Sequence, residues 1–299
     1  MATTGLGARR SALGGVMVPE VTPFDASGEL DGAAFRANLR AHIKAGVNGI
    51  VTAGSTGEAA LLDDEERVRL VELARAMVPA EQWVIAGVGA ESTRATIWRA
   101  RDAAAQGADA VLVVAPHYFG AQMTEEALEA HYRTVADAST VPVILYNIPK
   151  YAHFALSAAL VARLARHGNI IGIKDSSGDV ESLKGYLASQ SDAFTVLTGS
   201  GSGLLAALEL GARGGILAVA CFAASEAAGV YEAHGRGDRD AASAGQEKLA
   251  AYAKEIVGAL GPAGVKAAMD AAGLKGGPVR APLLPVSAAQ REAIVKLLA

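Results

Sequence analysis

Short apolar runs of four to six residues alternate with longer alanine-rich stretches along most of this chain. The runs are continuously apolar, as in 111–114, and do not alternate between apolar and polar positions. Continuous burial of this kind is typical of parallel strands that are covered on both faces. We therefore predict eight strands, at 16–21, 47–52, 83–88, 110–115, 143–146, 170–174, 194–197 and 215–219.

The alanine-rich stretches between these runs predict helices. Gly46, Gly107 and Gly211 each follow such a stretch, where glycine can take the left-handed conformation that ends a helix. The predicted helices cover 31–45, 64–77, 93–106, 124–138, 157–167, 179–188, 202–211 and 223–235. Eight successive strand–helix units favour a (β/α)8 TIM barrel. An open doubly wound sheet is the alternative, and it is disfavoured because no Gly-x-Gly-x-x-Gly follows the first strand.

The pattern changes after residue 237, where only helices are predicted and prolines separate them. These helices cover 239–258, 262–272 and 287–298. We therefore expect a flexible N-terminal segment over 1–13, the barrel over 14–237, and a C-terminal helical region over 238–299 that packs on the barrel.

Composition narrows the class of protein. The chain has 299 residues, of which 51% are hydrophobic and 19% charged, and this apolar fraction excludes general disorder. A net charge of −4 provides no basic excess for nucleic acid, and no window is apolar enough to span a membrane. The first 15 residues have no apolar core, so they are not a secretory signal. The single Cys221 fits a reducing compartment, and we expect a cytoplasmic protein without nucleic-acid or membrane partners.

Catalytic groups of a barrel are expected at the C-terminal ends of its strands. The sixth strand ends in Lys174, and burial there disfavours the charged form, leaving a free amine that can attack a carbonyl. The alternatives are a lysine that faces solvent and one that pairs with Asp175. The fifth strand ends in Tyr146, whose phenol could move a proton at the same substrate or could be an ordinary buried hydroxyl.

Two glycine-rich segments follow other strands. At 54–58 (GSTGE), the hydroxyls and amides of Ser55 and Thr56 suit a carboxylate or phosphate, with a helix-capping turn as the alternative. The segment 199–203 (GSGSG) follows the seventh strand, where barrels often bind anions, with a flexible helix start as the alternative. The six histidines lack metal-ligand spacing, so we expect each at the surface or at a helix cap and predict no metal site.

Three motifs together resemble those of the dihydrodipicolinate synthase and N-acetylneuraminate lyase family of Schiff-base enzymes. They are GSTGE at 54–58, YNIP at 146–149 and GIKDSSG at 172–178, in the order and at the spacing of the family. The similarity extends from about residue 14 to the C-terminus. It implies an eight-stranded barrel with a helical C-terminal region, a homotetramer built as a dimer of dimers, and no metal or organic cofactor.

The same resemblance implies a role for each matching residue. Lys174 would form an imine with pyruvate or another 2-oxo acid, and Tyr146 would move protons. Ser55 and Thr56 would hold the carboxylate of this acid and help to relay protons. Tyr118 matches a family tyrosine that reaches into the site of the neighbouring subunit. Four further residues would line the substrate: Ser176, Gly199, Ser200 and Ile216.

Departures from the family motifs bear on the substrate. Tyr151 stands where the lysine-biosynthetic branch has an arginine for the carboxylate of its aldehyde partner, and residues 200–202 replace the acidic residues of sialic acid lyases. The segments 197–204 and 276–283 are most similar to 4-hydroxy-2-oxoglutarate aldolases. The resemblance thus favours cleavage of a 4-hydroxy-2-oxo acid to pyruvate and an aldehyde such as glyoxylate. Alternatives are dihydrodipicolinate synthase, a 2-keto-3-deoxy sugar acid aldolase or dehydratase and, outside enzymes, a non-catalytic sensor of 2-oxo acids.

Overall fold

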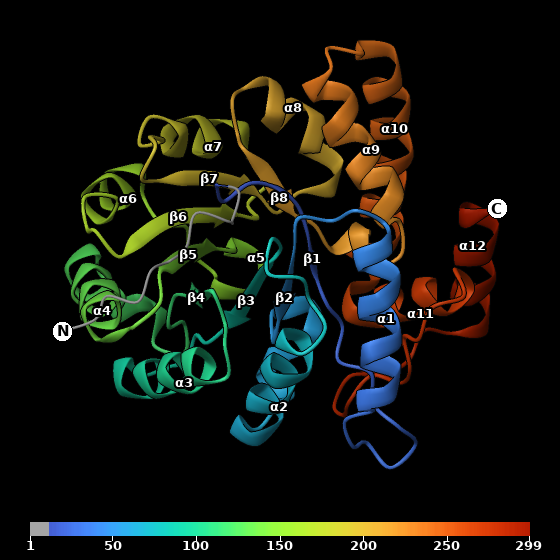
Figure 1. The fold of residues 1–299 in the computed structure, drawn as a ribbon, viewed down its shortest axis with the longest axis horizontal. Coiled ribbons are helices and arrows are strands. Elements are labelled where there is room, and N and C mark those ends of the chain that lie inside the picture. The colour runs from blue at the N-terminus through green and yellow to red at the C-terminus, as the bar shows by residue number, and fades with distance from the viewer. Residues whose placement is uncertain (1–11) are drawn as a thin grey trace.

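The computed structural model describes residues 12–299 and shows a closed barrel of eight parallel strands (Figure 1). Neighbouring strands pair in chain order, and the eighth strand pairs with the first to close the ring. The strands are β1 (Gly15–Pro19), β2 (Gly49–Thr52), β3 (Trp83–Gly87), β4 (Ala110–Val114), β5 (Val143–Asn147), β6 (Ile170–Asp175), β7 (Thr195–Thr198) and β8 (Gly214–Ile216). The predicted TIM barrel is confirmed. We expected a flexible N-terminal segment over 1–13, and residues 1–11 of it lie outside the described part of the chain.

Both faces of the sheet are buried, which explains why the strand sequences are continuously apolar. Successive side chains of a strand point to opposite faces. In β1, Met17 packs inside the barrel with Ile85 and Ile144, whereas Val16 and Val18 belong to the layer between the sheet and the helices. The barrel therefore has an inner and an outer apolar core.

The outer layer consists of α1 (Gly32–Lys44), α2 (Asp64–Arg75), α3 (Thr93–Ala105), α4 (Glu125–Ala138), α6 (Ala158–Leu164), α7 (Val180–Leu187), α8 (Leu204–Glu209) and α9 (Ala224–Gly235). Six of these helices begin after a side chain that accepts a hydrogen bond from the first helical turn: Asp31, Asp63, Ser92, Thr124, Ser157 and Asp179. In α2 the cap is reciprocal, because the Glu66 carboxylate accepts from the Asp63 backbone N–H. Local capping signals thus fix where most of the helices begin.

The structure differs from the sequence prediction at several places, and three of them contribute residues to the pocket described below. The predicted strand 215–219 ends at Ile216, because the chain then turns into a short 3-10 helix, η5 (Ala218–Cys221). A further helix, α5 (Pro149–Ala152), follows β5, and proline is favourable at its first position. The predicted helix 239–258 divides into α10 (Arg239–Tyr252) and a π-helix, η6 (Ala253–Gly258).

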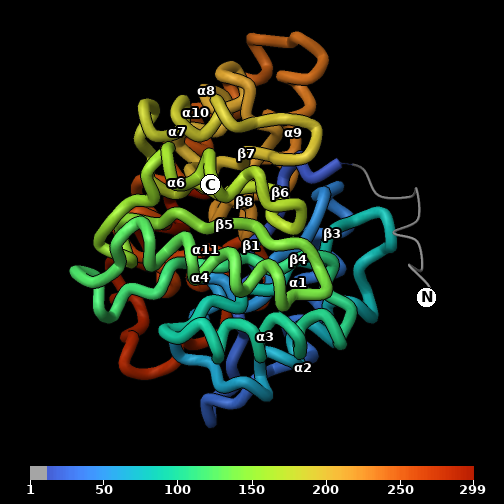
Figure 2. The backbone as a smooth tube through the Cα atoms, turned by 90° about the vertical axis from the view of Figure 1, so that its left-hand side faces the viewer, coloured from blue at the N-terminus to red at the C-terminus, as the bar shows by residue number. Residues whose placement is uncertain are grey.

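The C-terminal helices extend the outer core of the barrel. Figures 1 and 2 show α10 beside α9, and α12 (Ala288–Leu298) packs on α11 (Ala259–Ala271). Within α11 a kink at Gly261, with φ of 58°, precedes Pro262. Apolar side chains of this region join the outer core: Leu249, Ile256, Val265, Met269 and Ile294. The region therefore packs against the barrel and has no separate core.

Two histidines are buried, so the expectation that each histidine lies at the surface or at a cap is wrong for them. His42 Nδ1 lies 2.5 Å from Glu20 Oε1, and its Nε2 lies 3.0 Å from the carbonyl oxygen of Cys221. Burial opposes protonation of His42, but the Glu20 carboxylate outweighs it and raises the pKa of the imidazole. Burial lowers the pKa of His131 to about 4. The partners of His42 are distant in sequence, so spacing did not reveal them.

Candidate active site

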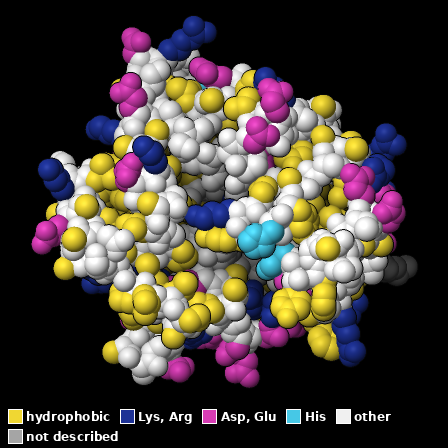
Figure 3. All heavy atoms as spheres, turned by 180° about the vertical axis from the view of Figure 1, so that it is seen from behind, with side chains coloured by type: hydrophobic (Ala, Val, Ile, Leu, Met, Phe, Trp, Pro, Cys, Tyr) yellow, Lys and Arg dark blue, Asp and Glu magenta, His cyan; other side chains and the backbone are white. Residues whose placement is uncertain are grey.

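A pocket of about 260 Å³ opens at the C-terminal ends of the strands. Its lining comes from the ends of β5, β6 and β8, from the loops after β2 and β7, and from η6 and α11. The space-filling view shows a hollow near the middle of one face, with a lysine or arginine side chain across it (Figure 3). The pocket therefore lies where barrel enzymes bind their substrates.

Lys174 and Tyr146 stand side by side in this pocket. They are register partners on the adjacent strands β6 and β5, so their side chains leave the sheet on the same face. Lys174 Nζ lies 4.3 Å from the centroid of the Tyr146 ring, and each residue is only 5% exposed. An amine and a phenol so placed can act on one bound molecule.

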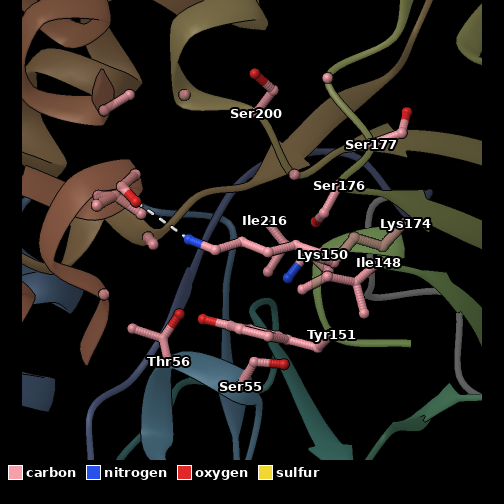
Figure 4. Close-up of a pocket in the computed structure, with 18 of the residues that line it drawn as sticks. Ser55, Thr56, Ile148, Lys150, Tyr151, Lys174, Ser176, Ser177, Ser200 and Ile216 are labelled. Carbon is pink, nitrogen blue, oxygen red and sulfur yellow. Dashed lines mark hydrogen bonds between the residues drawn. The ribbon is translucent and has the colours of Figure 1, made fainter. Parts of the chain in front are cut away.

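Ser55 and Thr56 line the pocket from the loop after β2 (Figure 4). Ser55 Oγ lies 3.5 Å from Tyr146 Oη, so the two hydroxyls are at the limit of hydrogen-bond distance. The loop is held against the chain after β1, where Thr22 Oγ1 donates to the Gly57 carbonyl at 2.7 Å. A Cβ atom at Gly57 would lie 2.7 Å from a backbone carbonyl oxygen, so the close approach requires glycine.

Gly199 lies against the side chain of Lys174. A Cβ atom here would overlap Ser176 Oγ and would lie 3.0 Å from Lys174 Cε. The Gly199 N–H donates to the Asp175 carbonyl at 2.6 Å, which holds the loop after β7 in place. The absence of a side chain at position 199 therefore leaves the Lys174 side chain room to reach a substrate.

A set of polar residues fixes the ends of β5 and β6. Asp175 Oδ1 accepts from Asn147 Nδ2 at 2.8 Å, and Oδ2 accepts from Ser177 Oγ at 2.8 Å. Asn147 Oδ1 in turn accepts from the Leu156 N–H at 3.0 Å. The carboxylate of Asp175 is thus used within the strand ends and forms no ion pair with Lys174 among the described residues. The sequence alternative that paired these two residues is wrong.

Lys150 and Tyr151 of α5 also line the pocket (Figure 4). Lys150 Nζ donates to the Gly258 carbonyl at 3.1 Å and lies 5.8 Å from the centroid of the Tyr151 ring. Burial raises the pKa of the Tyr151 phenol, and the nearby Tyr146 adds to this effect. Sequence reasoning gave Lys150 no role, because α5 was not predicted and Gly258 is remote along the chain.

The C-terminal region forms one wall of the pocket. Sequence reasoning missed these residues, since neither charge nor a motif marks them, and Pro262 within α11 was interpreted only as a helix breaker. The wall consists of Ala253, Val257 and Gly258 from η6, and Gly261, Pro262 and Val265 from α11.

Tyr118 is the one predicted site residue that the fold does not bring to the pocket of its own chain. It follows β4, is 79% exposed, and lies edge-to-face with the exposed Phe119 at 5.0 Å between ring centroids. Glu91 Oε2 accepts from the backbone N–H groups of His117 and Tyr118, at 2.9 and 2.8 Å. This loop therefore presents two aromatic rings outward on a fixed backbone.

All other predicted site residues line the pocket at the C-terminal ends of the strands: Lys174, Tyr146, Ser55, Thr56, Ser176, Gly199, Ser200 and Ile216. Lys150 and Lys174 are the only basic side chains among the described lining residues, and none of these residues is acidic. Residues 12–299 contain no group of three or more His, Cys, Asp or Glu side chains that could hold a metal ion. No helix in the described part of the chain has both the length and the apolar character needed to cross a membrane.

A buried amine beside a phenol and two hydroxyls, at the C-terminal mouth of a TIM barrel, supplies the groups that Schiff-base chemistry of the class I aldolase type requires. Residues 12–299 match the Dihydrodipicolinate synthetase family over their whole length. The chain belongs to this family of pyruvate-dependent lyases.

Similar proteins agree with this assignment. A 4-hydroxy-tetrahydrodipicolinate synthase from Xanthomonas axonopodis pv. citri is 39% identical over 289 residues, which cover 96% of this chain and 94% of the relative. The Escherichia coli K12 prophage protein YagE, solved in complex with pyruvate, is 31% identical with a TM-score of 0.91, and the match covers 96% of this chain and 98% of YagE. The dihydrodipicolinate synthase from Acinetobacter baumannii, also complexed with pyruvate, is 32% identical with a TM-score of 0.89, covering 95% and 97%. None of the three is named as a 4-hydroxy-2-oxoglutarate aldolase, so these relatives do not support that branch.

Proposed function

We propose that this protein binds pyruvate, or a 2-oxo acid that contains a pyruvate unit, as an imine on Lys174 and makes or breaks the adjoining carbon–carbon bond. The observation that carries the proposal is the position of Lys174 Nζ, 4.3 Å from the centroid of the Tyr146 ring in a pocket without acidic lining residues. Of the two lining lysines, Lys174 is the buried one, and its primary amine can attack the carbonyl carbon of a 2-oxo acid held in the pocket.

The chemistry follows from these groups. The Lys174 amine attacks C2 of the 2-oxo acid, and loss of water gives the imine. In cleavage, Tyr146 removes the proton of the C4 hydroxyl, the C3–C4 bond breaks, and its electron pair flows into the imine to give an enamine while an aldehyde leaves. Protonation of C3 and hydrolysis of the imine release pyruvate and restore the amine. Condensation runs through the same steps in reverse.

The remaining lining residues position the substrate. Ser55 and Thr56 donate hydrogen bonds to the carboxylate next to the reacting carbonyl, and Ser55 relays protons to and from Tyr146. Four further lining residues complete the contacts to the bound acid. They are the side chains of Ser176 and Ser200 and the backbone of Gly199 and Ile216.

Two reactions compete for this site. Relatives named 4-hydroxy-tetrahydrodipicolinate synthase support condensation of pyruvate with aspartate semialdehyde, which we place first. Cleavage of 4-hydroxy-2-oxoglutarate to pyruvate and glyoxylate is the second candidate. It is favoured by Tyr151, which stands where the lysine-biosynthetic branch has an arginine, and by the similarity of the segments 197–204 and 276–283 to 4-hydroxy-2-oxoglutarate aldolases.

Parallel assays on one preparation separate these reactions. Condensation is followed as consumption of pyruvate in the presence of aspartate semialdehyde, and cleavage as release of pyruvate from 4-hydroxy-2-oxoglutarate or a 2-keto-3-deoxy sugar acid. Faster turnover with the semialdehyde supports the first candidate, and faster cleavage of 4-hydroxy-2-oxoglutarate supports the second. Imine formation with pyruvate but no turnover in any assay would contradict an enzymatic role and support a 2-oxo acid sensor.

We also propose that the working form is a homotetramer in which Tyr118 completes the site of a neighbouring subunit. The exposed rings of Tyr118 and Phe119, on a loop held by Glu91, support this proposal because exposed aromatic groups often mark interaction surfaces. The buried thiol of Cys221 supports a cytoplasmic location, where thiols stay reduced.

A further inference from the structure

The two strands that carry Tyr146 and Lys174 are paired irregularly. The register between them shifts between Val143 and Ile144 of β5, where β6 contains one extra residue. A bulge of this kind interrupts the ladder of hydrogen bonds and bends the strand. The pairing at the N-terminal ends of β5 and β6 therefore does not by itself fix the pairing at their C-terminal ends, where Tyr146 is the register partner of Lys174.

The register at these C-terminal ends decides which side chains reach the pocket. Successive side chains of a strand point to opposite faces, so a shift by one residue would turn Lys174 out of the barrel and Asp175 into it. Ile173 belongs to the outer core, which places Asp175 on the same outer face of β6. Neither Asp175 nor its register partner Asn147 lines the pocket. Contacts of this pair on the outer face can therefore fix the register without reaching the substrate.

Asp175 is a buried carboxylate that receives three hydrogen bonds. It is 3% exposed, and its Oδ1 accepts from Asn147 Nδ2 at 2.8 Å and from the Ser177 N–H at 3.0 Å. Its Oδ2 accepts from Ser177 Oγ at 2.8 Å, and Figure 4 shows this serine side chain directed away from the centre of the pocket. Hydrogen bonds to an ionised acceptor are shorter and stronger than those between neutral groups. The carboxylate therefore ties the end of β6 firmly to the end of β5.

Asn147 is oriented for this contact by a second hydrogen bond. Its Oδ1 accepts from the Leu156 N–H at 3.0 Å, so the amide presents Nδ2 to Asp175. Asn147 and Asp175 are the last register pair of the two strands and follow Tyr146 and Lys174 directly. The side-chain contact thus lies one residue beyond the amine and the phenol that act on the substrate.

We propose that Asp175 is a positioning residue of the reaction, which acts through Asn147 to hold Tyr146 opposite Lys174. This inference rests on the proposed function, because the imine on Lys174 and the proton transfer by Tyr146 are the steps that need this register. A displacement of about 1 Å between reacting groups can slow a reaction about a hundredfold. Loss of the contact should therefore slow proton transfer much more than it weakens the binding of pyruvate.

The test uses pyruvate as the only ligand. Exchange of its methyl protons for deuterium in heavy water, followed by NMR, measures proton transfer at C3 of the enamine, a step that we assign to Tyr146 with Ser55. Borohydride trapping measures the pyruvate concentration that half-saturates the adduct on Lys174. We expect Asp175→Ala to lower the exchange rate at saturating pyruvate about tenfold or more, and to change the half-saturating concentration less than about threefold. Equal changes in both quantities, or an exchange rate within about threefold of wild type, would overturn the proposal.

Further variants separate the hydrogen bonds from the charge. Asp175→Asn loses the charge but keeps an acceptor oxygen for Asn147, so it should recover most of the exchange rate that Asp175→Ala loses. Asn147→Ala should slow exchange without weakening pyruvate binding, and it carries the test if Asp175→Ala does not fold. The double variant Asp175→Ala/Asn147→Ala should be no slower than the slower single variant, because residues that act as one unit are not additive. An Asp175→Asn protein as slow as Asp175→Ala, or additive losses in the double variant, would refute the role of the pair.

Asp179→Ala is the matched control for stability. The Asp179 side chain accepts from the Glu181 N–H and from the N–H and hydroxyl of Ser182, but it is exposed, and these partners all lie within α7. Loss of this helix cap should lower the melting temperature and leave the exchange rate within about twofold of wild type. If Asp179→Ala slowed exchange as much as Asp175→Ala does, general destabilisation would explain both, and the positioning role would fall.

Failure of the proposed function has a different signature, which appears in the wild-type protein. If wild type traps no pyruvate on Lys174, or exchanges none of its methyl protons, the enzymatic assignment falls, and the positioning role falls with it. If wild type does both and only the expected differences among the variants are absent, Lys174 keeps its role and the proposal for Asp175 alone is refuted.

Discussion

Replacement of Lys266 by methionine is expected to destabilise the protein by about 3–5 kcal/mol, the usual cost of removing one partner of a buried ion pair. Lys266 Nζ lies 2.5 Å from Glu58 Oε1, and the two side chains are 1% and 0% exposed. Nζ also donates to the Pro278 carbonyl at 2.7 Å and lies 4.4 Å from the centroid of the Phe24 ring. The variant would leave the carboxylate of Glu58 buried without its cation.

Urea denaturation measures this loss of unfolding free energy. It compares four proteins: wild type, Lys266→Met, the double variant Glu58→Gln/Lys266→Met and the control Lys184→Met. The double variant Glu58→Gln/Lys266→Met should be more stable than Lys266→Met alone, because it leaves no unpaired buried charge. In the control Lys184→Met, which breaks the exposed 2.8 Å pair with Glu181, the loss should be about 0.5 kcal/mol or less. A loss below about 1 kcal/mol for Lys266→Met, or a double variant that is no more stable than this single one, would refute the reasoning.

The same pair connects the C-terminal region to the loop that carries Ser55 and Thr56. Glu58 ends the GSTGE segment in the left-handed conformation, with φ of 58°, and its Oε2 accepts from the Arg280 N–H at 2.8 Å. Loss of Lys266 should therefore also lower turnover through Ser55 and Thr56, at temperatures where the variant is still folded.

Three further predictions concern the site, the buried histidine and the assembly. Tyr146→Phe should keep imine formation but lose most turnover, and a near-normal kcat would remove the phenol from proton transfer. Because the pKa of His42 is raised above 6.5 by Glu20, the stabilising effect of its protonation is complete below pH 6.5 and is lost as the pH rises through the higher folded value. The stability difference between wild type and His42→Gln in urea should therefore shrink from pH 6 to pH 9, and a constant difference would contradict this. Mixing inactive Tyr118 and Lys174 variants should restore part of the activity, since hybrid oligomers contain intact sites; no rescue would argue against a shared site.

The C-terminal ends of strands β5 and β6 were predictable from the sequence, and with them the positions of Tyr146 and Lys174. Lys174 and Tyr146 each end a continuously apolar run, and a closed parallel barrel brings the ends of adjacent strands together. The last strand was predicted too long because Ala218–Cys221 is apolar as well, and burial in a 3-10 helix has the same composition as burial in a strand.

Long-range pairs were not predictable in the same way. Glu58 meets Lys266, Glu20 meets His42, and Lys150 meets the carbonyl of a residue in the π-helix, each across a gap that no local periodicity records. The hydrophobic pattern indicates which side of an element is buried, whereas these contacts depend on how elements pack in space. Two of the three involve the C-terminal region, and the contact of Glu20 with His42 joins the chain after β1 to α1.

The proposal that Lys174 forms an imine with pyruvate is tested most directly by borohydride reduction in the presence of pyruvate, followed by peptide mass spectrometry. A stable mass increment is expected on the peptide that contains Lys174, and this increment should be lost in Lys174→Met. A mass increment on another lysine, such as Lys150 at the pocket mouth, or no mass increment at all, would contradict imine formation on Lys174.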